Sequence, residues 1–368
     1  MNAPACSILC AAFGLLALLN TPIVARLQHS GLISTTDGSI VFDWNTNTPS
    51  GEATAFAPNG GFASVSVDDS ASGNGITRLH CGNVFLGYGA GSHGVLALRG
   101  SGTTLLRGFM YIANGANSRG TFGMAGGVQI IDETYLNRNC FLGLAAGAHG
   151  TMIIEDPGTR LFLADSLLVG YREESFGTLR VRNAGTCEAN QFWVGRFAGA
   201  YGRVIVSGAG SLLSGWGNSH NYVGFSVRGY LTVEGGAVAN LPALDIGHGE
   251  GSYGEIMITG QGSRLECSYG GIYVGRGSSS TGPIGEGVVR LARGGVMHGT
   301  NSLRVGESSY NPKGTLIFTI GDDGSGAIIP GRVDADDAIL LSNAYLKMEV
   351  DPGLSLSIGQ VFTLIAVS

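Results

Sequence analysis

Carboxylates are the side chains of this sequence best suited to acid–base chemistry. Three acidic groups stand out, namely Glu155–Asp156, Glu173–Glu174 and Glu234. A polysaccharide-cleaving enzyme would need two such acids about 5 to 10 Å apart, or acids that bind Ca²⁺ beside a basic residue. Glu155 and Arg182 instead occupy the same position of neighbouring repeat units, which predicts a surface ion pair worth at most about 1 kcal/mol. We therefore interpret these acids as structural and assign no catalytic residue.

A denser acidic group lies near the C-terminus. It consists of Asp322, Asp323, Asp334, Asp336 and Asp337. Carboxylate oxygens are the ligands that Ca²⁺ prefers, so this group could bind a calcium ion. Its spacing fits neither the EF-hand loop nor the Gly-Gly-x-Gly-x-Asp repeat that binds calcium in β-helices. Solvated turns are the favoured interpretation, Ca²⁺ is the alternative, and no other cofactor is expected.

Rings, imidazoles and a guanidinium occupy the position before a recurring glycine. The set comprises His93, Arg119, His149, Phe176, Tyr201 and Tyr253. The two histidines fall two repeat units apart, roughly 10 Å at the spacing of stacked strands, which is too far for a shared metal ion. The favoured interpretation is an exposed mixed ladder. Alternatively, Phe176, Tyr201 and Tyr253 present ring faces to a glycan chain or to a partner protein.

Two segments, Gly89–Gly94 and Gly249–Gly254, read G-x-G-x-x-G. A dinucleotide site needs these glycines to open a helix whose N-terminus faces the pyrophosphate. Both segments here open an alternating, strand-like run. We therefore interpret them as turns of the repeat.

Glycines define the elements that must position all these side chains. One glycine follows an aromatic–aliphatic pair and recurs at steps of roughly 27 residues, which is typical of a solenoid. Ala113 takes its place in one unit, and the glycine itself falls at Gly87, Gly143, Gly170, Gly195, Gly224, Gly247, Gly275 and Gly306. Each unit also holds three short alternating runs, which predict strands joined by glycine turns. We expect an all-β, right-handed parallel β-helix of roughly nine to eleven coils with atypical N- and C-terminal caps.

Composition and segment order indicate an exported chain. Residues 1–25 hold an apolar run too short to span a bilayer and predict a signal peptide. An N-terminal cap (26–77), the repeat array (78–311) and final coils with a C-terminal cap (312–368) follow, and no later segment suits a membrane helix. The net charge of −6 comes without a basic run, which argues against nucleic acid as a partner. The four cysteines after the signal lie in different units and are expected to be core residues rather than disulfides.

The repeat units themselves are similar to those of a known family. Tyr222–Gly224, Gly254–Ile258 and Gly208–Ser211 resemble the repeats associated with autotransporter (type V secretion) passengers and PEP-CTERM-sorted proteins, over about residues 78–350. The resemblance implies a bacterial β-helix that is secreted or displayed at the cell surface or outer membrane, as a scaffold or adhesin. It implies no family-wide catalytic residues. The partner would be an extracellular glycan or a cell-surface protein, and the alternative function is a polysaccharide-binding or polysaccharide-cleaving β-helix.

Overall fold

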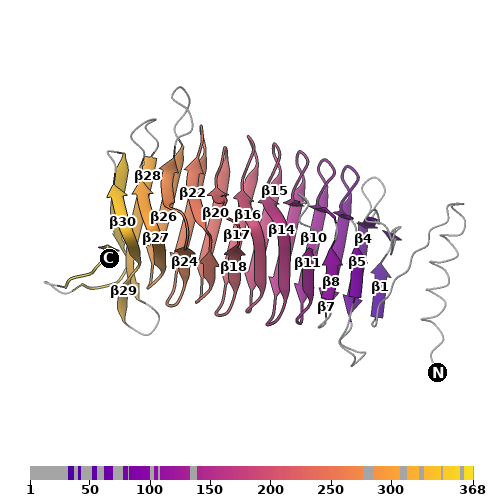
Figure 1. The fold of residues 1–368 in the computed structure, drawn as a ribbon, viewed down its shortest axis with the longest axis horizontal. Coiled ribbons are helices and arrows are strands. Elements are labelled where there is room, and N and C mark those ends of the chain that lie inside the picture. The colour runs from indigo at the N-terminus through magenta and orange to yellow at the C-terminus, as the bar shows by residue number, and fades with distance from the viewer. Residues whose placement is uncertain are drawn as a thin grey trace, which may run out of the picture.

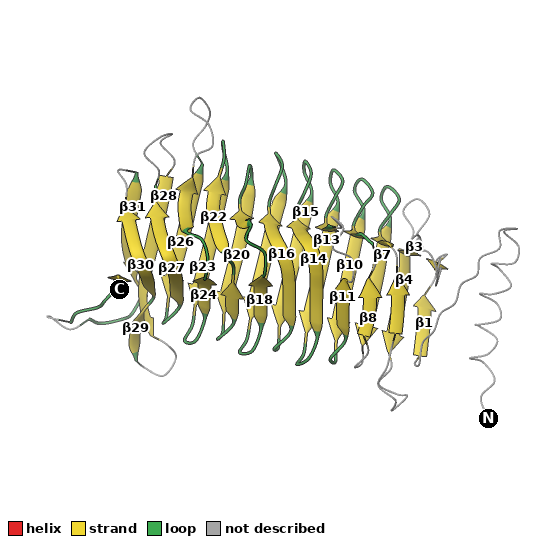
Figure 2. Ribbon diagram, in the orientation of Figure 1, coloured by secondary structure: helices red, strands yellow, loops and turns green. Residues whose placement is uncertain are grey.

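In a computed structural model, the chain forms a rod of stacked coils made of two β-sheets (Figure 1). The structure describes residues 32–36, 40–42, 52–55, 62–68, 78–81, 83–99, 103–106, 108–132, 139–276, 285–306, 313–322, 327–340, 343–356 and 360–367, with side chains from Val84 onward except at 103–106. These residues contain no helix (Figure 2). The predicted all-β solenoid is therefore confirmed, whereas the predicted signal peptide lies outside the described residues.

The first sheet, sheet A, takes one strand from each coil. Parallel pairing joins successive coils from β4 to β31, and the glycines at the second position of the strands align from Gly94 to Gly314. The 13 strands are β1 (Leu32–Thr36), β4 (Phe62–Asp68), β7 (His93–Arg99), β10 (Arg119–Ala125), β13 (His149–Glu155), β15 (Phe176–Arg182), β17 (Tyr201–Ser207), β20 (Arg228–Glu234), β23 (Tyr253–Thr259), β26 (Glu286–Ala292), β28 (Lys313–Asp322), β29 (Ile328–Pro330) and β31 (Ala344–Val350).

The second sheet, sheet B, forms the opposite wall of the rod. Its 19 strands are β2 (Ile40–Phe42), β3 (Glu52–Ala55), β5 (Arg78–Cys81), β6 (Asn83–Leu86), β8 (Thr103–Leu106), β9 (Met110–Ile112), β11 (Gln129–Asp132), β12 (Cys140–Leu142), β14 (Arg160–Val169), β16 (Thr186–Val194), β18 (Leu212–Gly215), β19 (His220–Val223), β21 (Val238–Asn240), β22 (Ala243–His248), β24 (Arg264–Cys267), β25 (Ile272–Arg276), β27 (Val296–Val305), β30 (Arg332–Leu340) and β32 (Ile365–Val367).

The cross-section of a coil has two sides, although the three strands expected per unit are present as separate strands in several coils, such as the one with β17, β18 and β19. The third run of one unit and the aromatic–aliphatic run of the next lie in sheet B, and they join into one strand in β14, β16 and β27. The backbone between them stays extended and takes up the extra residue as a bulge, as between Leu163 and Ser166. A coil with such a continuous strand is therefore closed by only two turns.

Antiparallel pairing occurs where the regular ladder stops. β1 pairs antiparallel with β4, β2 pairs antiparallel with β3, and β29 folds back on β28. Because an unpaired strand edge invites further pairing, these strands cover part of the edge that a regular coil would leave open. No described helix is long and apolar enough to cross a membrane.

The core lies between the two sheets as columns of aliphatic side chains. Burial alternates along most sheet A strands of the array, so that Gly177, Leu179 and Val181 of β15 are buried while their neighbours face outward. Cys140, Cys187 and Cys267 are buried and form no disulfide, as predicted, and burial raises the pKa of each thiol. The side chain of Cys81 lies outside the described residues.

Two glycines per coil allow sheet B to turn into sheet A. The repeat glycines from Gly87 to Gly306 have φ between 66° and 75°, and Ala113 adopts 64°. A side chain at Gly170 would lie closer than 3.0 Å to the backbone at Tyr201 of the next coil. One at Gly177 would lie as close to the backbone nitrogen of Gly170 and to the carbonyl oxygen of Leu142. This edge of the rod is thus too tight for a Cβ at either position.

Replacing Gly177 with alanine tests this contact. Because the new methyl group would overlap backbone atoms of two coils, Gly177→Ala should lower the free energy of unfolding by about 2 to 4 kcal/mol. Gly123→Ala is the matched control, since Gly123 lies in a sheet A strand and a Cβ there would meet nothing within 4 Å. The control should be neutral or slightly stabilising. Urea denaturation followed by circular dichroism measures both, and equal midpoints would contradict this account of the edge.

Candidate functional site

The predicted ring column on sheet A is present, but it is not continuous in the way expected. Phe176 pairs with Tyr201, whereas Arg228 lies between Tyr201 and Tyr253 in the register. Tyr230, two residues further along its strand, fills the gap, with ring centroids 5.1 Å from Tyr201 and 5.9 Å from Tyr253. The sequence interpretation overlooked Arg228 because its unit has a shorter turn before the glycine.

Contacts within sheet A use much of this ring surface. The imidazole of His149 stacks on Phe176 with centroids 4.5 Å apart, and Phe176 is 41% exposed. The hydroxyl of Tyr253 donates to Oε2 of Glu255 at 2.7 Å. Burial and this hydrogen bond together raise the pKa of Tyr253. His93 and His149 are separated by Arg119 in the ladder, as expected for two histidines that share no metal ion.

Charges on sheet A compensate one another between coils. Arg182 donates from Nε to Oε2 of Glu155 at 2.6 Å, which confirms the predicted ion pair. Lys313 reaches Glu286 at 2.8 Å, and Arg290 reaches Glu255 at the same distance. All these side chains are partly exposed, so each pair contributes at most about 1 kcal/mol. Their main effect is to leave sheet A with charges of both signs.

The acids considered for glycan cleavage are spread over the rod. Glu155 and Glu234 end strands β13 and β20, with β15 and β17 between them, which corresponds to roughly 14 Å at the spacing of parallel strands. Asp156 accepts a hydrogen bond from the backbone of Gly126 in the neighbouring turn. Glu173 and Glu174 are exposed in the turn at the opposite edge, where Glu174 has φ 55°. None of these positions forms the close pair that hydrolysis requires.

The acids considered for calcium binding are also divided between elements. Asp322 ends β28 in sheet A, whereas Asp334, Asp336 and Asp337 belong to β30 in sheet B. Arg332 donates from Nε to Oδ2 of Asp334 at 3.1 Å. Asp323 lies outside the described residues. Within the described part of the chain, no three His, Cys, Asp or Glu side chains are placed to hold a metal ion, and the calcium hypothesis stays a prediction.

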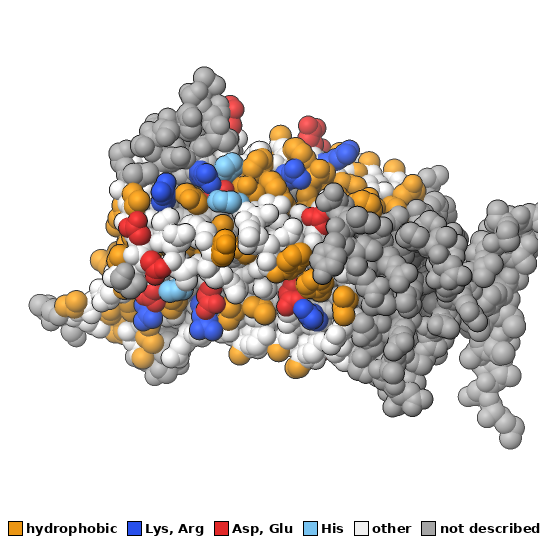
Figure 3. Space-filling model, viewed as in Figure 1, with side chains coloured by type: hydrophobic (Ala, Val, Ile, Leu, Met, Phe, Trp, Pro, Cys, Tyr) orange, Lys and Arg blue, Asp and Glu red, His pale blue; other side chains and the backbone are white. Residues whose placement is uncertain are grey.

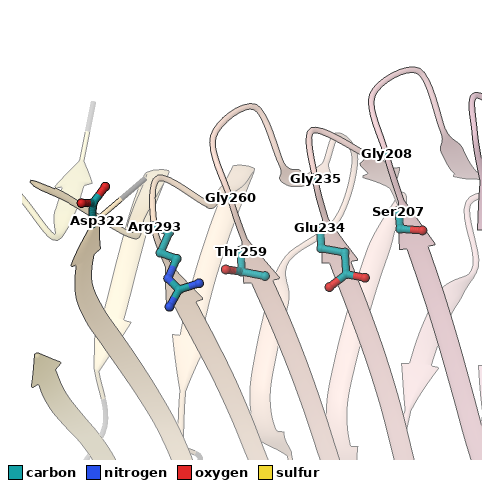
Figure 4. Close-up of a pocket in the computed structure, with 8 residues that line it drawn as sticks. All are labelled: Ser207, Gly208, Glu234, Gly235, Thr259, Gly260, Arg293 and Asp322. Carbon is teal, nitrogen blue, oxygen red and sulfur yellow. The ribbon is translucent and has the colours of Figure 1, made fainter. Parts of the chain in front are cut away.

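A shallow groove follows the turns at the end of the sheet A strands (Figure 4). It is lined by Ser207, Gly208, Glu234, Gly235, Thr259, Gly260, Arg293 and Asp322. The guanidinium of Arg293 pairs with Asp351 at 3.1 Å. Glu234 and Asp322 come from strands with β23 and β26 between them, again roughly 14 Å apart by strand spacing. The groove therefore offers backbone groups and charged side chains spread along the rod, not a close acid pair.

Sheet B carries a longer array of rings. It is formed by the middle residue of the aromatic–aliphatic run, one residue from each coil. The register aligns Phe85, Tyr111, Phe141, Leu168, Trp193, Tyr222, Asp245, Tyr273 and Arg304 in one outward column. Tyr111 stacks between Phe85 and Phe141, with centroids 4.8 and 5.3 Å away and planes within 8° of parallel. Trp193 stacks on Tyr222 at 4.2 Å. Such pairs each contribute about 0.5 to 1.5 kcal/mol beyond area burial.

A second column flanks this ladder, formed by the residue after each repeat glycine. It includes Tyr88, Tyr171, Arg196, Phe225, His248 and Arg276. Its rings lie at steep angles to those of the ladder, as for Tyr88 on Phe85 (83°), Tyr171 on Phe141 (71°) and Phe225 on Tyr222 (82°). Edge contacts of this kind leave ring faces that the ladder does not use. We call the two columns together the sheet B strip.

Guanidinium groups continue the strip by lying on its rings. Arg196 lies 4.2 Å from the ring centroid of Trp193 and 5.3 Å from those of Tyr171 and Phe197. Arg276 lies 4.4 Å from Tyr273, and Arg304 reaches the same ring at 5.7 Å. Cation–π contacts between partly exposed side chains such as these contribute about 0.5 to 2 kcal/mol each. In Figure 3, hydrophobic side chains follow the upper border of the face shown, with Lys or Arg and His among them toward the C-terminal end.

Asp245 interrupts the ladder with a carboxylate that is only 1% exposed. Nη1 of Arg276 contacts both its oxygens, at 3.1 and 3.2 Å. The Nδ1 atoms of His220 and His248 lie 3.2 and 3.5 Å from Oδ2. A buried carboxylate needs such partners, so Asp245 fixes one guanidinium and two imidazoles at the surface above it.

Asn221 holds this part of the strip in register. The backbone of Phe192 donates to its Oδ1 at 2.9 Å, and its Nδ2 donates to the carbonyl of Ala243 at 3.0 Å. The side chain is buried and bridges the coils before and after its own. Because strands β18 and β19 are separated by residues 216–219, this bridge replaces the continuous strand found in β16.

The sheet B strip was not recognised from the sequence, although a signal was present. The sequence interpretation followed the glycine of each unit and assigned no surface role to the aromatic residue before it. Strict alternation points the middle residue outward, because Val84 and Leu86 on either side of Phe85 are buried.

The chain matches no protein-family model, no curated protein and no solved structure. A proposed function therefore rests on this surface.

Two arginines offer a comparison of buried and exposed ion pairs. Arg276→Gln should lower the free energy of unfolding by about 2 kcal/mol, because the carboxylate of Asp245 stays buried without its guanidinium. Arg182→Gln should cost less than about 1 kcal/mol, because both partners of that pair meet solvent. Chemical denaturation of the two variants measures the difference. Equal losses would show that Asp245 does not depend on Arg276.

Proposed function

We propose that the chain is a non-enzymatic solenoid scaffold that binds an extracellular partner through the sheet B strip. The observation that supports this is the strip itself: rings and guanidinium groups in register over successive coils, outside the core. The core columns already join the coils, so stacking of the coils does not require aromatic residues on the outer face. Trp, Tyr and Arg are also the residues that dominate binding energy at interfaces.

The strip suits an extended partner. Tyr88 of the strip and Phe197 beside it are 45% and 43% exposed, and they lie on different coils along the rod. Contacts spaced along an axis favour a ligand that runs along it, such as a glycan chain or the edge of another protein, over a compact molecule. A scaffold or adhesin function follows from such a surface. Cleavage has no comparable support, because the described acids do not gather.

We also propose that the protein is exported and acts at the cell surface or in the extracellular medium, as a relative of autotransporter-passenger or PEP-CTERM-associated proteins. The support comes from the sequence: the apolar segment within residues 1–25 and the repeat units between residues 78 and 350. The buried, unbridged thiols do not oppose this, since core cysteines persist as small hydrophobes wherever solvent is excluded.

A glycan-array and polysaccharide-degradation screen of the purified full-length chain tests the proposal. We expect binding that weakens at least tenfold in Trp193→Ala, with no release of reducing or unsaturated ends. Phe162→Ala is the matched control, because Phe162 is an outward ring of sheet B away from the strip, stacked on Trp216. Adding Ca²⁺ or EDTA should leave binding unchanged. Release of chain ends would contradict the non-enzymatic proposal, and equal effects of the two variants would contradict the assignment of the strip.

A further inference from the structure

We infer that the C-terminal part of the sheet B strip, from Trp193 to Arg304, binds an acidic polysaccharide whose chain lies along the rod. This inference rests on the proposed function and specifies its ligand class. The strip is not uniform along its length. Its N-terminal part, around Phe85, Tyr111 and Phe141, is a stack of rings. Its C-terminal part adds every arginine and histidine of the two columns.

The exposed charges of this part are guanidinium groups. Arg196 and Arg304 lie on rings, Arg276 lies on a ring and pairs with Asp245, and the imidazoles of His220 and His248 lie beside that pair. Among the described residues of the two columns, the one carboxylate is Asp245, and it is 1% exposed, so its oxygens meet Arg276, His220 and His248 and not solvent. This basic surface belongs to a chain with net charge −6. A ligand that carries carboxylates is therefore complementary here.

Sheet A provides an internal comparison. It too has arginines and rings, but three of its cations pair with acids of neighbouring coils, namely Arg182 with Glu155, Arg290 with Glu255 and Lys313 with Glu286. A negative ligand on that face would have to displace those acids. On the sheet B strip, the rings hold Arg196 and Arg304 in place, and a ring does not compete for the hydrogen bonds of a guanidinium.

The spacing of the groups fits a polymer. The basic groups occur in the successive coils that contain β16, β19, β22, β25 and β27. At about 4.8 Å per coil they cover roughly 20 Å along the rod. A single phosphate or carboxylate could meet one or two of them, whereas a chain of uronic acids could meet each in turn. The rings of Trp193, Phe225 and Tyr273 lie between the cations and can contact the apolar faces of the sugars.

Acidic residues of the adjoining turns set the limits of the site. Glu173 and Glu174 are exposed in the turn before β15, one coil ahead of Arg196. Glu250 is exposed in the turn between β22 and β23, next to this part of the strip. Repulsion from Glu250 should weaken an acidic ligand, so Glu250→Gln should bind it more tightly. A neutral ligand would not respond to that change.

The test measures binding of the full-length chain to polygalacturonate, with dextran as the neutral polymer and polyglutamate as an acidic polymer without sugars. We expect binding to polygalacturonate alone, weaker at higher salt. The Arg196→Ala, Arg304→Ala double variant should lose at least tenfold in affinity, and Glu250→Gln should gain about twofold. The control is Arg180→Ala, Arg203→Ala, which removes two exposed arginines of sheet A and should change affinity less than twofold. Circular dichroism checks that each variant is folded.

Several results would overturn this inference. It is wrong if the chain does not bind polygalacturonate, or if it binds dextran or polyglutamate equally well. It is also wrong if the two double variants lose the same affinity for polygalacturonate. The proposed function fails separately. If a neutral glycan or a protein binds and Trp193→Ala abolishes it while the arginine variants do not, the strip remains a binding surface and only the acidic polysaccharide is wrong. If no strip variant changes any binding, both fail.

Discussion

Sheet B passes into sheet A at an edge where backbones of two coils approach too closely for a side chain on either glycine. The amide of Gly170 donates to the carbonyl of Leu142 one coil earlier at 2.8 Å, and that of Gly195 donates to Val169 at 2.9 Å. The hydrogen bonds between coils thus continue through the turn and do not stop at the strand ends. The turn and both sheets are hydrogen-bonded to the next coil in the same register. A coil therefore cannot slip relative to its neighbour without losing hydrogen bonds in sheet A, in sheet B and in the turn between them.

This common register is what creates surface columns. Each outward position of a strand stacks on the same position one coil away, whatever side chain it carries. Rings then stack, cations lie over rings, and acids meet bases, as Tyr111, Arg196 and Glu155 illustrate. The sheet B strip and the ion pairs of sheet A are therefore two results of one geometry. They differ only in which side chains the outward positions hold.

The sequence predicts the fold better than the site because the two depend on different residues. Gly87 and its equivalents recur where the backbone adopts a positive φ that favours glycine, with Ala113 the exception, so the sequence predicts the coil from them. The Glu155–Arg182 pair followed from the same register. The continuity of β14 did not, since a bulge between Leu163 and Ser166 leaves no glycine to mark it. The charge cluster around Asp245 could not be predicted either, because only the folded coils bring His220, His248 and Arg276 to it.

Inward and outward side chains form separate columns, so substitutions on the surface of the rod are separated from substitutions in its core. Asp245 stands in a column position that holds Tyr222 in the preceding coil and Tyr273 in the next, and the core residues Leu244 and Ile246 beside it are buried like their equivalents. An outward residue can thus be exchanged in one coil while its neighbours and the interior stay as they are. Duplication of a coil would likewise copy a segment of surface together with its support. The rod is in this sense a series of separately variable surface segments on a repeated frame, and its surface can change without a change of its fold.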